Sequence, residues 1–218
     1  MNRRLVRTFA DVRGVLIAHG FEVKADMCRA VPADYNTGTH GLLAIFNGRA
    51  LIPALWGYLP TWMKDQSRFQ LSARIETVFE KPMFQGPVRN SRCVVPVDAY
   101  VELNPTGRAV VGPHLVYRQD RAPFFLGGLY TENLDGNPTV ALLTKPASAA
   151  MRSFCERMPV AFEDHIGGNK WLIAKDVSHN IEWFAHHAIA ARVLDESQND
   201  AQLLDAVGTR APGPLTRP

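Results

Sequence analysis

The fold is decided by a stretch that runs from Trp56 to Glu102 and contains four short motifs. They are Trp56-Gly57-Tyr58-Leu59-Pro60-Thr61-Trp62, Ser72-Ala73-Arg74-Ile75-Glu76-Thr77, Arg92-Cys93-Val94-Val95-Pro96 and Tyr100-Val101-Glu102. Two tryptophans flank a proline turn, an arginine lies two residues from a glutamate, and a lone glutamate ends an apolar run. Core packing alone does not require this set of side chains, so the stretch indicates a functional site.

Length and composition are those of an ordinary globular protein. The chain has 218 residues, 46% of them hydrophobic, and a formal net charge of +3. This charge is too small to demonstrate a nucleic-acid partner, although it permits a local basic patch. The three cysteines are widely spaced and form no CxxC pair, which argues against a disulfide framework and a zinc site. We therefore expect a cytoplasmic protein without metal or cofactor. No apolar run approaches the ~20 residues of a membrane span.

The hydrophobic pattern outside the motifs predicts many short strands and a few helices. Residues 41–46 and 49–56 are expected to form two strands joined at Asn47-Gly48, a strong hairpin signal. Further strands are expected over residues 93–97, 99–103, 114–118, 124–130, 139–144, 158–162 and 188–193. Helices are expected to begin near Thr8 and to cover residues 147–154, 169–174 and 180–187. The pattern predicts one α+β domain over residues 1–205, with a mostly antiparallel, barrel-like β core and peripheral helices, followed by a loose tail over 206–218.

The order of the motifs resembles the SRAP family, the SOS response-associated peptidase domains. The family begins Met-Cys-Gly-Arg and continues with Tyr-Asn-x-x-Pro, Trp-Gly-x-x-Pro-x-Trp, Asn-Ala-Arg-x-Glu-Thr, Arg-Cys-x-x-Pro, aromatic-x-Glu and His-x-Arg-Met-Pro. Here the start is Met1-Asn2-Arg3-Arg4, Tyr35-Asn36 follows, and Cys155-Glu156-Arg157-Met158-Pro159 comes after the four motifs above. Each piece is weak alone, but together they are collinear over nearly the whole chain.

The resemblance implies a SRAP-like fold and a role in the response to DNA damage. Family members sense abasic sites in single-stranded DNA through a cysteine at the second position, exposed by removal of the initiator methionine. Its free amine forms a Schiff base with the ring-opened sugar, and its thiol closes a thiazolidine ring. An asparagine, a glutamate and a histidine of the family surround that ring, and the glutamate also serves propeptide autoproteolysis.

This chain departs from the family at the reacting groups. Position 2 is Asn2, whose amide is not a nucleophile and cannot close a thiazolidine. Ser72 replaces the family asparagine, and Cys155 replaces the histidine. The departures predict a diverged, phage-related member that forms no stable crosslink. Whether it keeps an enzymatic activity stays open, including a reversible Schiff base with the Met1 amine.

Six residues are predicted to bind single-stranded, abasic DNA in a cleft that Glu102 also lines. They are Arg4, Asn36, Trp62, Ser72, Arg74 and Glu76. Arg74 can bind a phosphate with charge assistance, or it can form a structural pair with Glu76 on one face of an extended segment. Trp62 follows a proline turn and suits base stacking, whereas Trp56 lies in an apolar strand and suits the core.

Glu102 is the predicted catalytic residue because it ends an apolar run. A buried, unpaired carboxylate is costly. The group is therefore either paired or held with a raised pKa for proton transfer.

Two other readings stay open beside the abasic-site hypothesis. One is a monomeric binding module for DNA or a protein that has lost all chemistry. The other is a thiol peptidase or hydrolase that uses Cys155, for which the sequence names no activating base. The second reading requires Cys155 to react with iodoacetamide faster than Cys28 and Cys93.

Overall fold

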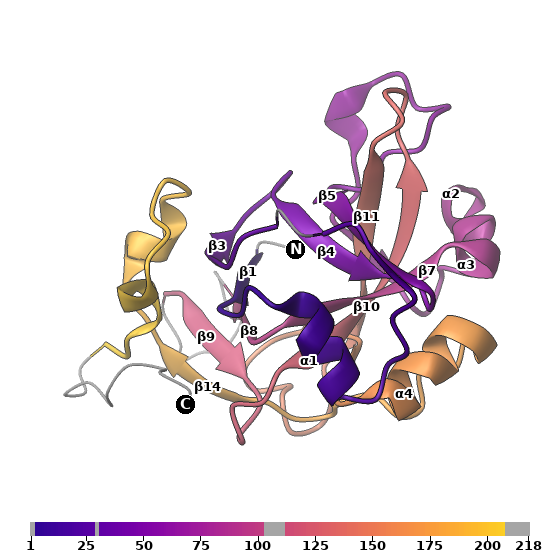
Figure 1. Ribbon diagram of the computed structural model, residues 1–218. Coiled ribbons are helices and arrows are strands. Elements are labelled where there is room, and N and C mark those ends of the chain that lie inside the picture. The colour runs from indigo at the N-terminus through magenta and orange to yellow at the C-terminus, as the bar shows by residue number, and fades with distance from the viewer. Residues whose placement is uncertain (1–2, 29–30, 103–111, 208–218) are drawn as a thin grey trace.

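The computed structural model describes residues 3–28, 31–102 and 112–207. These residues form two β-sheets with short helices around them (Figure 1), so the predicted α+β class is confirmed. The smaller sheet has the strand order β14 (Ala185–Ala188), β9 (His114–Tyr117), β8 (Ala99–Glu102), β1 (Arg3–Arg7) and β3 (Asp34–Thr37). All of its neighbouring strands are antiparallel.

The larger sheet contains the predicted barrel. Its order is β12 (Arg157–Pro159), β11 (Pro138–Pro146), β10 (Phe124–Glu132), β7 (Arg92–Val97), β4 (Leu42–Phe46), β5 (Ala50–Trp56) and β2 (Ala25–Asp26). Strand β5 also pairs in parallel with β11, so β11, β10, β7, β4 and β5 close on one another. Two short strands, β6 (Ser72–Arg74) and β13 (Ala161–Phe162), add to β11 and β10. The β4–β5 hairpin turns at Gly48, whose φ of 88° favours glycine.

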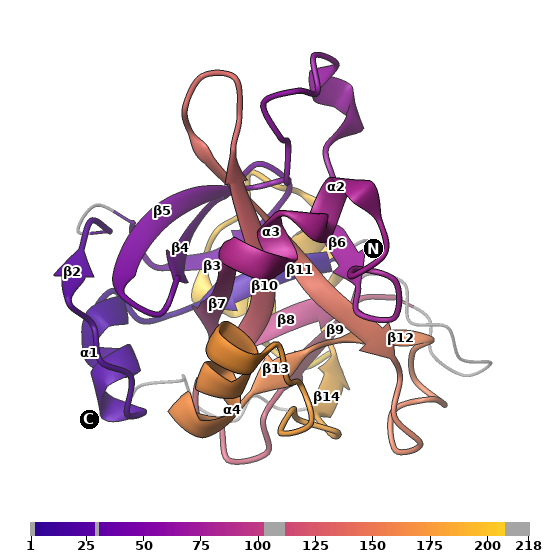
Figure 2. The ribbon, with the colours of Figure 1, turned by 90° about the vertical axis from the view of Figure 1, so that its right-hand side faces the viewer.

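The helices are short and lie outside the barrel (Figure 2). They are α1 (Val12–Ala18), α2 (Pro82–Gln85), α3 (Pro87–Asn90) and α4 (His165–Asn169), with a π-helical turn at Lys170–Ala174 and 3-10 turns at Gln66–Arg68, Ala191–Leu194 and Ala201–Leu204. The predicted N-terminal helix is confirmed, and Asp11 caps it by accepting a hydrogen bond from the backbone N–H of Gly14. No helix in the described ranges is long and apolar enough to cross a membrane.

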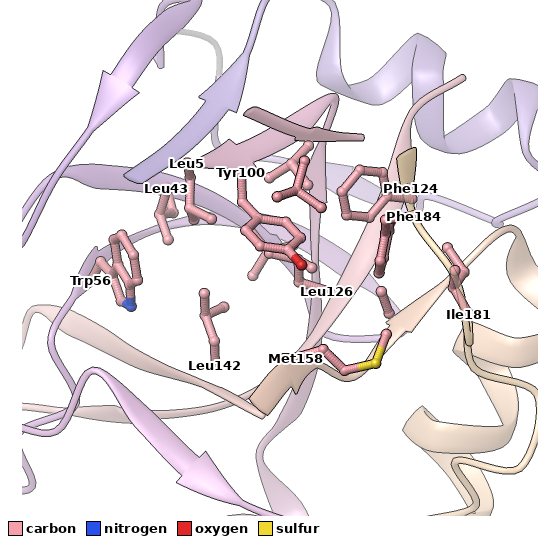
Figure 3. Close-up of a cluster of buried hydrophobic side chains, with 14 of the residues drawn as sticks. Leu5, Leu43, Trp56, Tyr100, Phe124, Leu126, Leu142, Met158, Ile181 and Phe184 are labelled. Atoms are coloured by element: carbon pink, nitrogen blue, oxygen red, sulfur yellow. The ribbon is translucent and has the colours of Figure 1, made fainter. Parts of the chain in front are cut away.

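A hydrophobic cluster joins the two sheets (Figure 3). Leu5 and Tyr100 of the smaller sheet meet Trp56, Leu126 and Leu142 of the larger one in this cluster. Trp56 is 1% exposed, and its indole N–H donates to the Leu71 carbonyl at 3.0 Å. This confirms the interpretation of Trp56 as a core residue. The helices cover a second cluster on another face of the barrel, to which α1 contributes Val12 and Leu16.

Two predicted helices are wrong. Residues 147–154 form successive turns in the connection between β11, which ends at Pro146, and β12, which begins at Arg157. Residues 180–187 are extended, and the last of them belong to β14, which pairs with β9. Pairing with an exposed sheet edge outweighs the modest local preference for a helix. Strands β1 and β3 were not expected at all, because each is short and polar.

The end of the described chain is still attached to the sheet. Ala206 forms a β-bridge with Ile189, and the Val207 backbone N–H donates to the Ala188 carbonyl. The predicted tail from 208 onward lies outside the described residues. The domain boundary at residue 205 stays a prediction.

Candidate active site

A row of paired residues crosses the smaller sheet at one end. The backbone of Arg3 on β1 pairs with Glu102 on β8, and Glu102 pairs with His114 on β9. Residues paired directly across an antiparallel sheet present their side chains on the same face. Glu102 and His114 are 8% and 9% exposed, so this face holds two buried polar groups side by side. The predicted catalytic residue therefore has a neighbour that sequence reasoning missed.

A second histidine completes the group. His186 on β14 pairs with Val116, two residues along β9 from His114, and therefore lies on the same face. The Nδ1 atoms of His114 and His186 are 3.3 Å apart, a distance that fits a hydrogen bond in which one imidazole donates and the other accepts. Phe154 stacks on His186 with ring centroids 3.9 Å apart and also contacts the ring of His114 at 5.3 Å.

Burial and the proximity of other histidines lower the pKa of both His114 and His186. For His114 the causes are, in order, desolvation and the nearby His186 and His187, and for His186 they are desolvation and His187. Each effect disfavours the charged imidazolium. The pair is therefore held in the neutral form more firmly than two exposed histidines.

The lowered pKa values predict a loss of stability in acid. Unfolded imidazoles take up protons near a pKa of ~6.5, whereas the folded pair does so only at lower pH. Because the unfolded chain then binds more protons, the free energy of unfolding falls as the pH drops below that range. Thermal unfolding at pH 8 and pH 5 measures this, and His186→Asn is expected to lessen the drop. An equal drop in both proteins contradicts the prediction.

Cys155 directly follows Phe154, the residue whose ring contacts both histidines. Its side chain is 3% exposed within the cluster that joins the sheets. Cys28 and Cys93 are buried as well, and desolvation is the main cause that raises the pKa of each thiol, for Cys28 to about 12. A reactive cysteine needs an accessible thiolate. The burial of Cys155 therefore gives the thiol-hydrolase reading no support.

The motif around β6 lies on the larger sheet. Ser72 and Arg74 pair with Leu142 and Thr144 of β11, and Arg74 is exposed. Glu76 does not pair with Arg74 as the structural alternative supposed. It accepts two hydrogen bonds from the Arg157 guanidinium, at 2.7 and 2.8 Å, and these lower the pKa of Glu76. Arg157 thus neutralises Glu76, which leaves the exposed Arg74 as the cation of this motif that can meet a phosphate.

Arg4 and Asn36 lie away from the row of Glu102 and His114. Arg4 pairs with Val101 and therefore presents its side chain on the opposite face, where it forms an ion pair of 2.9 Å with Glu196. Asn36 is 4% exposed and donates to the carbonyls of Asp195 and Gln198, both at 3.0 Å. These contacts fix the segment 195–198 against the sheet. They explain both residues structurally, and DNA contact by either stays a prediction.

Trp62 is the exposed member of the tryptophan pair. Its side chain is 63% exposed, in contrast to the buried Trp56. The segment between β5 and β6 that carries it rises beside the hairpin of β10 and β11 (Figures 1 and 2). Asn2, at the family's nucleophile position, lies outside the described residues. No group of three or more potential metal ligands occurs among the residues that the structure places.

Sequence reasoning missed His114 and His186 because their meeting depends on strand register. His114 opens a predicted strand, which was a visible signal. His186 was assigned to a helix, where it and His187 would point in different directions. In β14 the alternation of the strand sends His186 toward His114 and His187 toward Tyr117 and the Leu204 carbonyl.

Comparison with known proteins agrees with the family resemblance. The SRAP family model, described as SOS response associated peptidase, matches residues 7–198. Abasic site processing protein YoaM of Bacillus subtilis (strain 168) is 28% identical over 192 residues, which are 79% of this chain and 84% of that protein. Abasic site processing protein YoqW of the same organism is 31% identical over 127 residues, 56% of each chain.

Solved structures share the fold. A protein from Bacteroides thetaiotaomicron superposes with a TM-score of 0.78 at 21% identity, covering 95% of this chain and 100% of that one. A phage-related protein from Bordetella bronchiseptica superposes with a TM-score of 0.57 at 22% identity, covering 83% and 84%. At these identities the likeness establishes the architecture and nothing finer.

Proposed function

Because the chain belongs to the SRAP family, we propose that it binds abasic sites in single-stranded DNA during the response to DNA damage, without forming a thiazolidine crosslink. The observation that carries the proposal is the register of the smaller sheet, which brings the start of β1 to Glu102 and His114. Relatives named abasic site processing proteins supply the substrate class. Asn2 carries no thiol, and this removes ring closure.

The described surface offers groups suited to an unpaired strand. Trp62 presents an exposed aromatic face for stacking on a base, and Arg74 presents an exposed cation for a phosphate. Among the DNA-binding candidates, Arg74 and Trp62 have exposed side chains, and the third exposed candidate, Glu76, is bonded to Arg157. We further propose that the protein acts as a monomer in the cytoplasm.

An equilibrium titration tests the proposal. Fluorescence anisotropy compares an intact single strand with one that carries a single abasic site, at several salt concentrations. We expect tighter binding to the abasic strand and a log–log salt slope of about −0.7 for each neutralised phosphate. Equal, salt-independent affinity for both strands contradicts the proposal.

Trp62→Ala is expected to weaken DNA binding while leaving the fold intact. Stacking on an aromatic side chain contributes about 1–3 kcal/mol per base, which corresponds to an affinity about 5- to 150-fold lower. Substitution of an exposed side chain changes the free energy of unfolding by about 0.5 kcal/mol or less. The same anisotropy titration measures the affinity, with Trp183→Ala, an exposed tryptophan on the segment before β14, as the matched control. Equal losses in both variants contradict a specific role for Trp62.

A further inference from the structure

We propose that His114, hydrogen-bonded to His186, is the proton donor of this site and replaces the histidine that the chain lacks at Cys155. The inference rests on the proposed function and assigns it an acid. It follows from three placements: Glu102 opposite His114, His186 within hydrogen-bond distance, and Phe154 against both imidazoles. Phe154 is the neighbour of Cys155, so the imidazoles contact the residue beside the vacated position.

The pair is built to hold His114 in one orientation. Its Nδ1 is engaged by His186, which is in turn fixed by the stacked ring of Phe154. The remaining ring nitrogen, Nε2, has no partner among the described residues. A histidine whose one nitrogen is oriented by a second group leaves the other nitrogen for proton transfer. Glu102 occupies the register position opposite His114, on the same face of the sheet.

The reaction that needs this acid is condensation of an amine with the ring-opened sugar. A primary amine of the protein adds to the aldehyde carbon, and the amine proton moves to the oxygen to give a carbinolamine. The protonated fraction of His114, which grows as the pH falls, then gives a proton to the hydroxyl group, which leaves as water, while the nitrogen lone pair forms the C=N bond. The iminium returns one proton to His114. No oxidant or reductant is required, and the protons balance.

The alternative task for His114 is purely structural support of β9 and β14. His114→Asn separates the two, because the asparagine amide can keep the contact that Nδ1 makes with His186 but cannot titrate. A structural role predicts that His114→Asn keeps the rate of adduct formation. An acid role predicts that His114→Asn forms the adduct more slowly than the wild type.

The experiment uses the full chain and a single strand with one abasic site. Borohydride reduces the C=N bond, and the rate of trapped adduct is measured from pH 5.5 to 8, with affinity from anisotropy. We expect His114→Asn to bind the strand normally and to form the adduct at least about 10²-fold more slowly than the wild type. We expect the ratio of wild-type to variant rate to decrease as the pH rises, because the wild type loses its protonated imidazole. His179→Asn, an exposed histidine bonded to Lys170, is the control.

The outcomes separate the two proposals. Absence of binding by the wild type overturns the proposed function. Three results overturn the role of His114. They are normal binding by the wild type with no trapped adduct, an equal rate in His114→Asn, and a rate ratio that does not change with pH. Should His114→Asn unfold, His186→Asn provides the second variant, and it is expected to lower the rate because it releases the orientation of His114.

Discussion

Replacing Trp56 by alanine is expected to lower the free energy of unfolding by about 3–5 kcal/mol, the largest stability effect that we predict. The indole is 1% exposed and lies in the cluster that joins the two sheets (Figure 3). Alanine removes most of the buried volume and the hydrogen bond that the indole N–H donates to the Leu71 carbonyl. Strand β5 also closes the barrel at this residue, since Trp56 pairs with Val140 of β11.

Denaturant unfolding monitored by circular dichroism measures this change. Trp62→Ala is the matched control, because it removes the same side chain six positions later in the same motif. The expected pattern is reciprocal: Trp56→Ala loses stability, and Trp62→Ala loses DNA affinity. A loss of less than about 1 kcal/mol for Trp56→Ala contradicts its place in the core.

Glu102→Gln is expected to slow formation of the borohydride-trapped adduct by about 10²- to 10⁴-fold, the range for loss of a general acid or base. Glutamine keeps the shape of the side chain but cannot take up or give a proton. Glu102 is buried at the end of β8, directly opposite His114, where a carboxylate can relay the proton that the amine loses. DNA affinity is expected to change little, because the variant removes no cation.

Single-turnover trapping at saturating protein measures the rate separately from binding. Glu132→Gln, an exposed glutamate at the end of β10, is the control for loss of one negative charge. An unchanged rate in Glu102→Gln contradicts the catalytic role and leaves the binding module without chemistry as the better account.

The architecture was largely predictable because local signals and hydrophobic pattern agree over most of the sheet. The Asn47-Gly48 turn defines the β4–β5 hairpin, and short apolar runs bounded by turn residues define β7 to β11. The two tryptophans could also be told apart, since Trp56 continues a strand and Trp62 follows a proline. Strand β14 could not be predicted, because its pairing partner β9 lies about 70 residues earlier and decides its conformation.

The site was predictable only in part. Glu102 stood out as a carboxylate within an apolar run, and Arg74 as a cation in a recognisable motif. The bonds of Asn36 and Arg4 depend on the segment 195–198, which no local pattern connects to them. The His114–His186 contact depends on the register of β14 against β9, and a shift of one residue would send one imidazole to the other face.

Denaturing electrophoresis of the protein with an abasic single strand tests the central claim most directly. That claim is a retained site for the abasic sugar in a chain whose second residue has no thiol to close a ring. The account predicts a covalent band that survives heating only when borohydride has been added, and none with an intact strand. A heat-stable band without borohydride contradicts it.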